Sequence, residues 1–454
     1  MDASPGRNGF PGPEPGQPIG SILDRDAKPR AYAWYVAVIL MLAYTLSFVD
    51  RKLPFILVES IKHDLSLSDT QIGLLTGAMF ALVYSTIAIP IASLADRSSR
   101  KSILAISVLT WSALTSLGGF AQNFWQLAAS RVGVATGEAA CTPAAHSMIA
   151  DYFSPRYRSR AMGLYFVGAQ LGIILGLALG GWINELADWR VAMFLVGAPG
   201  FVLAMVVMFT VKEPPRTPSQ SPSAAPQQPA GINETMRALF RHGTFNHLMI
   251  AGLLSSFTTG AVQAFTPAYI IRTFHLNTAQ TGLTYGLTFG VAGVLGAVLG
   301  GSIGDRLRVA NPPAALTFVA ITMALGAPLM AFAFLSGNYL VFLALIFVAQ
   351  VGSMVYAGPS FATVQSLVAP RMHAVASAVY LFALSGIGLS LGPLVAGMLS
   401  DWFKAHGSTN SLRWAMLAVI FPRLWSGFHF FLSARSLKRE QKVLGVPAAY
   451  GAGA

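Results

Sequence analysis

Two charged residues lie inside one long apolar stretch of the sequence, residues 123–150. Arg131 and Glu138 are seven residues apart, which places them on one face of a helix, about 10 Å apart along its axis. An ionised side chain at the centre of a bilayer costs a few kcal/mol or more, so such residues usually face a wet cavity or a partner. The pattern leaves two uses open: an ion pair that only holds helices together, or a site that couples or gates transport.

A third charge, Asp50, lies in another apolar run. If that helix emerges near Val58 and the helix of Arg131 begins near Phe124, Asp50 and Arg131 lie at matching depths, about 10–12 Å below one surface. We therefore expect these two opposite charges to pair. Glu138 lies about 10 Å deeper, near the midplane, where a buried carboxyl can carry a proton at near-neutral pH.

These positions assign chemical roles. Glu138 and Asp50 are the candidate proton-coupling residues. Arg131 is the candidate anchor for a substrate anion, because its guanidinium stays charged and grips carboxylate or phosphate in two places. Glu138 can compete with that anion for Arg131, so Glu138 belongs to the candidate substrate site as well.

The composition requires lipid as the solvent for much of the chain. Apolar residues make up 54% of the 454 positions, charged residues only 11%, and the mean hydropathy is +0.58. Soluble proteins carry about a quarter charged residues, and one core cannot bury this much apolar surface. The net charge of +12 does not indicate a nucleic-acid partner, because the basic residues collect in short loops between apolar runs. A single cysteine, Cys141, excludes an intrachain disulfide and a cysteine metal site.

Apolar runs of about 20 residues predict an all-α membrane protein with twelve transmembrane helices. The predicted spans are 33–58, 70–94, 102–121, 124–150, 161–184, 191–211, 246–271, 279–303, 313–335, 338–364, 371–397 and 412–433.

The loops predict the orientation. Basic residues follow every second predicted span, as at Arg97 and Arg100 after the second and Arg156 after the fourth. The positive-inside rule then places both termini in the cytoplasm of a cell, with the protein in its inner membrane.

The chain contains two copies of one unit. Seven residue types within 71–97 recur 209 positions later, so that Asp96 and Arg97 correspond to Asp305 and Arg306. Two six-helix halves of the same topology are typical of a transporter with its site between them. We expect a disordered N-terminal tail (1–32), a first bundle (33–211), a proline-rich linker with a short interfacial helix (212–243), a second bundle (244–435) and a C-terminal tail (436–454).

The repeated loops resemble a family signature. ASLADRSSRK (92–101) is similar to the loop between helices 2 and 3 of the major facilitator superfamily, and GGSIGDRLR (300–308) is its counterpart in the second half. Ala92 and Ser99 replace the family's two usual glycines, and Arg308 replaces the second glycine of the later loop. The resemblance implies a major facilitator fold whose conformational gating residues are Asp96, Arg97, Arg100, Asp305 and Arg306.

A narrower resemblance is to the Spinster family. It rests on YTLSFVDRKLP (44–54), SLADRSSRK (93–101) and SRVGVATGEA (130–139). It implies transport of lysolipids or sphingosine phosphates, proton coupling, and helices 1 and 4 lining the cavity. Some organic-anion transporters share the Asp-Arg pair in helix 1, so small organic anions remain an alternative substrate class.

Four aromatic residues complete the candidate substrate site: Tyr165, Phe265, Tyr356 and Tyr380. Each can line an amphipathic pocket, and each can equally be plain packing or a lipid-facing anchor. We expect Arg51 to reach the outer interface and His146 to be a packing histidine. Arg423 falls in the middle of the last span, where a helix break after Pro422 or a snorkelling side chain are two explanations.

The sequence predicts a secondary transporter, not an enzyme, that works by alternating access. We expect proton coupling and an amphipathic, lipid-like anion as substrate, in a monomer with no cofactor, no metal and no nucleic acid. A facilitator for drugs or small organic anions is the alternative within transport, and a receptor that keeps a transporter fold is the alternative outside it. No phosphate loop with its lysine occurs, which argues against ATP-driven transport.

Overall fold

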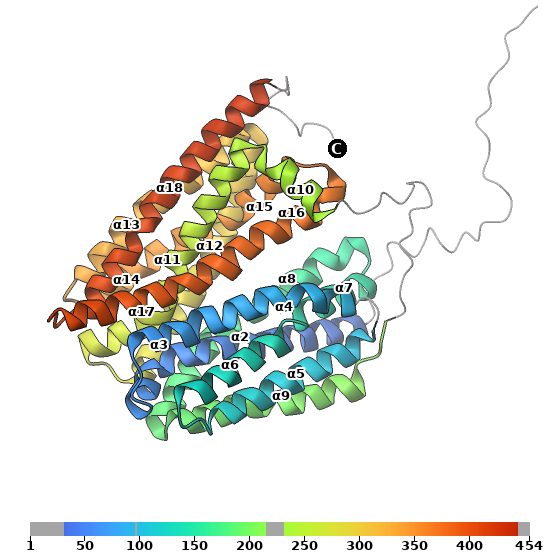
Figure 1. Ribbon diagram of the computed structural model, residues 1–454. Helices are drawn as coiled ribbons and strands as arrows, with labels where there is room; N and C mark the ends of the chain where they lie inside the picture. The colour runs from blue at the N-terminus through green and yellow to red at the C-terminus, as the bar shows by residue number, and fades with distance from the viewer. Residues whose placement is uncertain (1–30, 96–97, 215–230, 444–454) are drawn as a thin grey trace, which may run out of the picture.

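The computed structural model describes residues 31–95, 98–214 and 231–443, and these consist of helices joined by short turns, with no β-strand. Residues 1–30, 96–97, 215–230 and 444–454 lie outside the described chain, and with them parts of the expected N-terminal tail, linker and C-terminal tail. Figure 1 shows the helices gathered in two bundles, one from each half of the chain.

The first bundle holds six spans. Their helices are α2 (Ala31–Asp64), α3 (Asp69–Gly73) with the π-helix η2 (Leu74–Ala78) and α4 (Met79–Ala95), α5 (Arg100–Gly118), α6 (Phe124–Glu138) with α7 (Cys141–Tyr152), α8 (Pro155–Leu186) and α9 (Trp189–Thr210).

The second bundle follows a short helix, α10 (Ile232–Phe240). Its helices are α11 (Gly243–Phe274), α12 (Thr278–Ala310), α13 (Pro312–Leu335), α14 (Tyr339–Met354) with α15 (Ala357–Ser366), the short 3₁₀ turn η3 (Pro370–Met372) with α16 (His373–Leu381), the π-helix η4 (Phe382–Gly388) and α17 (Leu389–Ala405), and α18 (Ser411–Val443).

Eleven helical segments of the described chain are long and apolar enough to cross a membrane. The remaining predicted span, 124–150, which is the fourth of the twelve, is present but broken into α6 and α7 at Ala139 and Ala140. The break has a local cause in Pro143, which has no N–H to donate to the carbonyl four residues earlier and whose ring clashes with it. The expectation of one uninterrupted helix is therefore wrong at this point.

The corresponding span of the second half breaks for the same reason. Helix α14 ends at Met354, and Pro359 lies four residues after Val355, where the turn begins. Both breaks fall in the middle of the membrane-crossing length. Each proline leaves the carbonyl four residues before it without its helical N–H partner.

The two sides of the molecule differ in how the bundles meet. The start of α2 lies beside the end of α9, through Tyr32 and Thr210, and the start of α11 lies beside the end of α18, through Thr244 and Glu440. We call this the terminal side. The bundles lie against each other on the opposite side and diverge towards the terminal side, where α10 and α16 lie apart from α7 (Figure 1).

Glycines allow the close approach on the opposite side. A Cβ at Gly282 of α12 would lie 2.1 Å from the carbonyl oxygen of Leu177 in α8, and one at Gly181 would lie 2.2 Å from that of Thr278. Towards the terminal side the last such contact is that of Gly293 with Gln170, and from Gly296 onward α12 packs on its own bundle. The two halves are thus packed together over only part of the membrane thickness.

This packing gives a first prediction. Gly282→Ala should destabilise the described conformation by about 1–3 kcal/mol, because the new methyl forces α8 and α12 apart. Gly301→Ala on the same helix is the matched control, since nothing lies within 4 Å of its Cβ position. Thermal unfolding of both variants in detergent checks this. Equal melting temperatures would contradict the packing argument.

Candidate functional site

Glu138 lies at the end of α6, directly before the helix break, and its side chain is fully buried. Its Oε2 accepts a hydrogen bond from Ser47 Oγ at 2.8 Å and one from Arg51 Nε at 2.5 Å, both from α2. Its Oε1 has no hydrogen-bond partner in the structure. Glu138 is therefore half of a buried ion pair with one oxygen left over.

Arg51 is the partner of Glu138, which corrects the expectation that it reaches the outer interface. Helix α2 continues to Asp64, thirteen residues beyond Arg51, so this guanidinium lies about 20 Å from the helix end. It also lies over the rings of Tyr84 at 4.3 Å, Phe48 at 5.0 Å and Phe80 at 5.3 Å. Aromatic faces attract a cation, and this attraction is strongest where water is excluded.

Arg131 does not form the predicted ion pair with the carboxylate of Asp50. Its Nη1 donates to the backbone carbonyl of Asp50 at 3.3 Å, its Nε has no partner, and its guanidinium lies 5.0 Å from the Phe80 ring centre. The carbonyl is available because Pro54, four residues later inside α2, has no N–H to donate to it. Asp50 and Arg131 thus lie close enough to meet, as expected. The contact is made by the backbone carbonyl of Asp50 and not by its carboxylate.

Asp50 is 2% exposed, and its Oδ1 has no hydrogen-bond partner. An ionised carboxylate left without a partner in a low-dielectric interior costs several kcal/mol. Asp50, Arg51, Arg131 and Glu138 therefore form one buried cluster on α2 and α6, which we call the interior charge cluster. Arg51 and Glu138 form an ion pair within it, whereas Arg131 meets Asp50 through the backbone carbonyl of Asp50.

The four predicted aromatic residues do not meet in one pocket. Tyr165 is buried in the first bundle, where its ring stacks on Tyr44 at 4.3 Å. Phe265 and Tyr380 are buried in the second bundle, and Tyr380 packs edge-on against Phe361 at 5.2 Å. Tyr356 alone is half-buried. In this conformation Tyr165, Phe265 and Tyr380 are packing residues.

Of the five predicted gating residues, the structure describes Arg100, Asp305 and Arg306. Asp96 and Arg97 lie outside the described residues. Asp305 and Arg306 are exposed at the end of α12, and no ion pair joins either to another described residue.

Arg100 holds together three elements of the first bundle. It pairs with Asp151 of α7 and, at 3.0 Å, with Glu213 after α9, and it donates to Ser147 Oγ at 2.9 Å. Partial burial raises the pKa of Glu213, but hydrogen bonds from the Lys101 and Arg100 backbone and from the Ser99 and Arg100 side chains outweigh it and hold that pKa below its usual range. Arg100 makes these contacts within one half of the chain.

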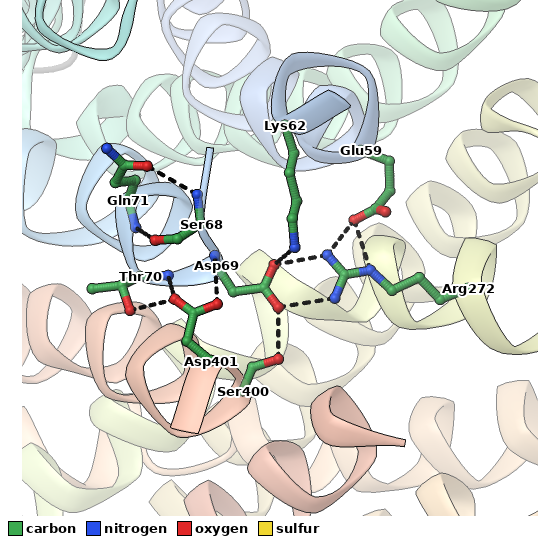
Figure 2. A network of polar contacts seen from close by, with 9 residues as sticks. All are labelled: Glu59, Lys62, Ser68, Asp69, Thr70, Gln71, Arg272, Ser400 and Asp401. Atoms are coloured by element: carbon green, nitrogen blue, oxygen red, sulfur yellow. Dashed lines mark hydrogen bonds and ion pairs between the residues drawn. The ribbon is translucent and has the colours of Figure 1, made fainter. Parts of the chain in front are cut away.

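The ion pairs found between described residues of the two halves lie on the opposite side (Figure 2). Arg272, at the end of α11, donates to both oxygens of Asp69, at 2.8 and 3.0 Å, and to Glu59 Oε1 at 2.6 and 3.0 Å. Asp69 is 1% exposed and also accepts from Lys62 and from Ser400 Oγ, the latter at 2.6 Å. One arginine of the second half thus binds two carboxylates of the first.

A second carboxylate crosses between the halves in the same place. Asp401 of α17 accepts from the backbone N–H groups of Asp69 at 3.1 Å and Thr70 at 2.8 Å, and from Thr70 Oγ1 at 2.6 Å. The first N–H groups of a helix have no partner within it, and they favour a negative charge. Asp401 therefore caps α3 across the interface. We call Glu59, Lys62, Asp69, Arg272, Ser400 and Asp401 the closing network.

Sequence reasoning missed the closing network as a site. The signal available was an isolated cation, Arg272, directly after the seventh predicted span. The pairing partners lie more than 200 residues apart, and no local pattern joins them.

Two hollows accompany these contacts. One of about 530 Å³ opens beside the closing network, between the ends of α2, α8 and α9 and the turn before α12. The other is about 10 Å³ and lies next to Arg131 and Thr76, too small for a substrate. The described residues contain no group of three or more His, Cys, Asp or Glu side chains arranged to hold a metal ion.

Comparison with known proteins decides the family. The model of the Major Facilitator Superfamily matches residues 40–393. The chain belongs to this superfamily. An MFS-type efflux pump of Mycolicibacterium smegmatis is 35% identical over 92% of this chain and 96% of its own length. Protein spinster homolog 1 of Xenopus tropicalis is 26% identical over 91% of this chain and 83% of its own.

A solved structure is similar over nearly the whole chain. It is a bacterial homologue of the human lysosomal transporter Spinster, in an inward-facing and unoccupied conformation, with a TM-score of 0.82 and 27% identity over 94% of this chain and all of that one. The expected major facilitator fold, its two six-helix bundles and the resemblance to Spinster proteins are confirmed, and this chain is an integral membrane protein of a transporter superfamily.

The closing network gives a second prediction. Arg272→Ala should strand Asp69 and Glu59 and open the opposite side, so that a maleimide applied from that side labels Thr76→Cys in a Cys141→Ala background. Thr76 lies beside Arg131 and is shielded while the network is intact. Arg190→Ala, which breaks an ion pair with Asp64 inside the first half, is the matched control and should leave labelling low. Low labelling in both variants would contradict the gating role.

Proposed function

We propose that this protein is a proton-coupled secondary transporter that moves an amphipathic, lipid-like anion by alternating access. The observation that carries the proposal is the interior charge cluster, in which one carboxylate is ion-paired with an arginine while a second carboxylate and a second arginine make no ion pair. Such groups are expensive in a membrane interior, and they mark substrate pathways and proton relays.

We assign the terminal side to the cytoplasm, in a cell's inner membrane, with both termini on that side. The described conformation is then closed towards the outside and faces inward. The closing network and the divergence of the bundles support this assignment, as does the similarity to a solved structure described as inward-facing. Alternating access requires the closing network to break when the terminal side closes.

Proton coupling rests on the state of the two carboxyl groups. Glu138, bound to Arg51 and Ser47, is the ionised partner of a buried pair. Asp50, without a partner for Oδ1, carries a proton in this conformation, because the neutral acid avoids the cost of an isolated charge. Protonation of Glu138 would release Arg51, and the two carboxyl groups would then exchange roles as the protein changes conformation.

The substrate assignment rests on Arg131. Its guanidinium is held to a backbone carbonyl and not to a carboxylate, so it keeps its charge for an anion. Glu138 competes with that anion for Arg131. Among the four aromatic candidates the half-buried Tyr356 is the one best placed for contact with an acyl chain. Tyr165, Phe265 and Tyr380 would reach a substrate only after repacking.

The remaining parts follow the same scheme. We propose a monomer with bundles at 33–211 and 244–435, joined by a linker, with α10 lying at the cytoplasmic membrane surface. Asp96, Arg97 and Arg100, with Asp305 and Arg306, would close the cytoplasmic side in the outward-facing state.

A second candidate substrate class is favoured by one comparison. The efflux pump of Mycolicibacterium smegmatis is more similar to this chain, at 35% identity, than the spinster homologue is, at 26%. Export of drugs or small organic anions would use the same interior charge cluster. Competition of such compounds with a lysolipid in transport separates the two classes.

The third prediction concerns coupling. In proteoliposomes with an imposed pH gradient, Glu138→Gln and Asp50→Asn should each abolish accumulation of a fluorescent lysophospholipid, while its binding to the purified variants changes less than tenfold. Glu234→Gln, at an exposed ion pair with Arg371, is the matched control and should transport normally. If the Glu138→Gln protein still accumulates the lysophospholipid against its gradient, proton coupling through this residue is refuted.

A further inference from the structure

Another arginine besides Arg51 and Arg131 lies in the membrane interior, in the half of the chain without the interior charge cluster. Arg423 of α18 is 0% exposed. It lies twelve residues from the start of α18, about 18 Å along the helix, and so near the middle of a hydrocarbon core about 30 Å thick. An arginine does not lose its proton in a protein, so a full positive charge is buried here.

The chain supplies no negative charge to this guanidinium. Residues 244–435 contain two carboxylates, Asp305 and Asp401. Asp305 lies near the end of α12 on the terminal side, and Asp401 caps α3 on the opposite side. Among the described residues Arg423 forms no salt bridge. Its Nη2 donates to Ser353 Oγ, and both Nε and Nη1 are buried without a partner.

The helix that carries Ser353 holds a further buried donor without a partner. Gln350, one helical turn before Ser353 on α14, is 1% exposed and its Nε2 has no partner. Gly326 of α13 keeps space beside the guanidinium, since a Cβ there would lie 3.0 Å from Arg423 Nε. A group of buried donors without acceptors matches a negatively charged ligand.

The internal repeat shows where the negative charge is missing. Asn123 and Asn338, which cap α6 and α14 with their side chains, are 215 residues apart, as are Pro155 and Pro370. At the same spacing Glu138 corresponds to Ser353, and each lies within two residues of its helix break. In the first half an arginine binds the carboxylate at this position. In the second half an arginine binds a neutral hydroxyl.

We propose that Arg423, with Ser353 and Gln350, forms an anion-binding site in the second bundle, and that the bound anion takes the place that Glu138 fills in the first. The ligand is a small desolvated anion or the ionised headgroup of an amphiphile. The half-buried Tyr356 lies at the break between α14 and α15, three residues after Ser353.

The test is thermal unfolding of the purified full-length protein in detergent. Sodium chloride is compared with sodium gluconate at equal ionic strength, and lysophosphatidic acid is compared in gluconate with the uncharged monoacylglycerol of the same chain length. A ligand that binds only the folded state raises the melting temperature as its concentration rises. Each comparison is made for the unchanged protein, Arg423→Met, Ser353→Asp and Ser353→Asn.

Two results support the site and identify its ligand. Stabilisation by chloride that is lost in Arg423→Met and Ser353→Asp assigns the site to a free small anion. Stabilisation by lysophosphatidic acid alone, lost in the same two variants, assigns it to a headgroup. Ser353→Asp should also melt higher than Ser353→Asn in gluconate, because it places a carboxylate beside Arg423. This comparison does not need the Arg423→Met variant, so it can still be made if that variant does not fold.

Two results overturn the site. The first is an unchanged protein that neither chloride nor lysophosphatidic acid stabilises. The second is a Ser353→Asp protein that keeps the full anion dependence of the unchanged protein.

Discussion

The buried ion pair between Arg51 and Glu138 is the interaction on which the rest of the first bundle depends. Two charges at 2.5 Å with Glu138 fully buried repay their desolvation only through close geometry and additional partners. Ser47 supplies one such partner, and the rings of Phe48, Phe80 and Tyr84 supply a face for the guanidinium. Removing the charge from either member leaves the other without compensation, so a proton on Glu138 acts on the whole arrangement.

Two prolines turn the backbone into part of the same site. Pro54 frees the Asp50 carbonyl that Arg131 binds, and Pro143 breaks the helix directly after Glu138. A local break lets the two parts of a span, α6 and α7, change their relative direction at small cost. The interior charge cluster thus lies at two interruptions of regular helix hydrogen bonding, and the closing network holds the far end of α2 in place.

The sequence predicted the spans well and the contacts between them poorly. Apolar length alone locates a membrane helix, whereas neighbouring residues of a helix point in directions about 100° apart. Asp50 and Arg51 are neighbours at almost the same depth, so depth alone did not predict which of them contacts α6. The helix also continues six residues beyond the exit expected at Val58. A pairing such as that of Arg272 with Asp69 depends on how two bundles meet, which no local pattern encodes. Asp96, Arg97, Asp305 and Arg306 stay predictions.

The central claim is that protonation of Glu138 controls which side of the protein is open. Spin labels at Leu186 and Leu340, exposed residues at the ends of α8 and α14 on the opposite side, report the separation of the two halves in a Cys141→Ala background. Pulsed electron paramagnetic resonance across a pH series should show two populations of label-to-label distance whose ratio changes with pH. In Glu138→Gln the ratio of these two populations should be the same at every pH. A Glu138→Gln protein whose populations still follow pH as the unchanged protein's do would contradict the claim.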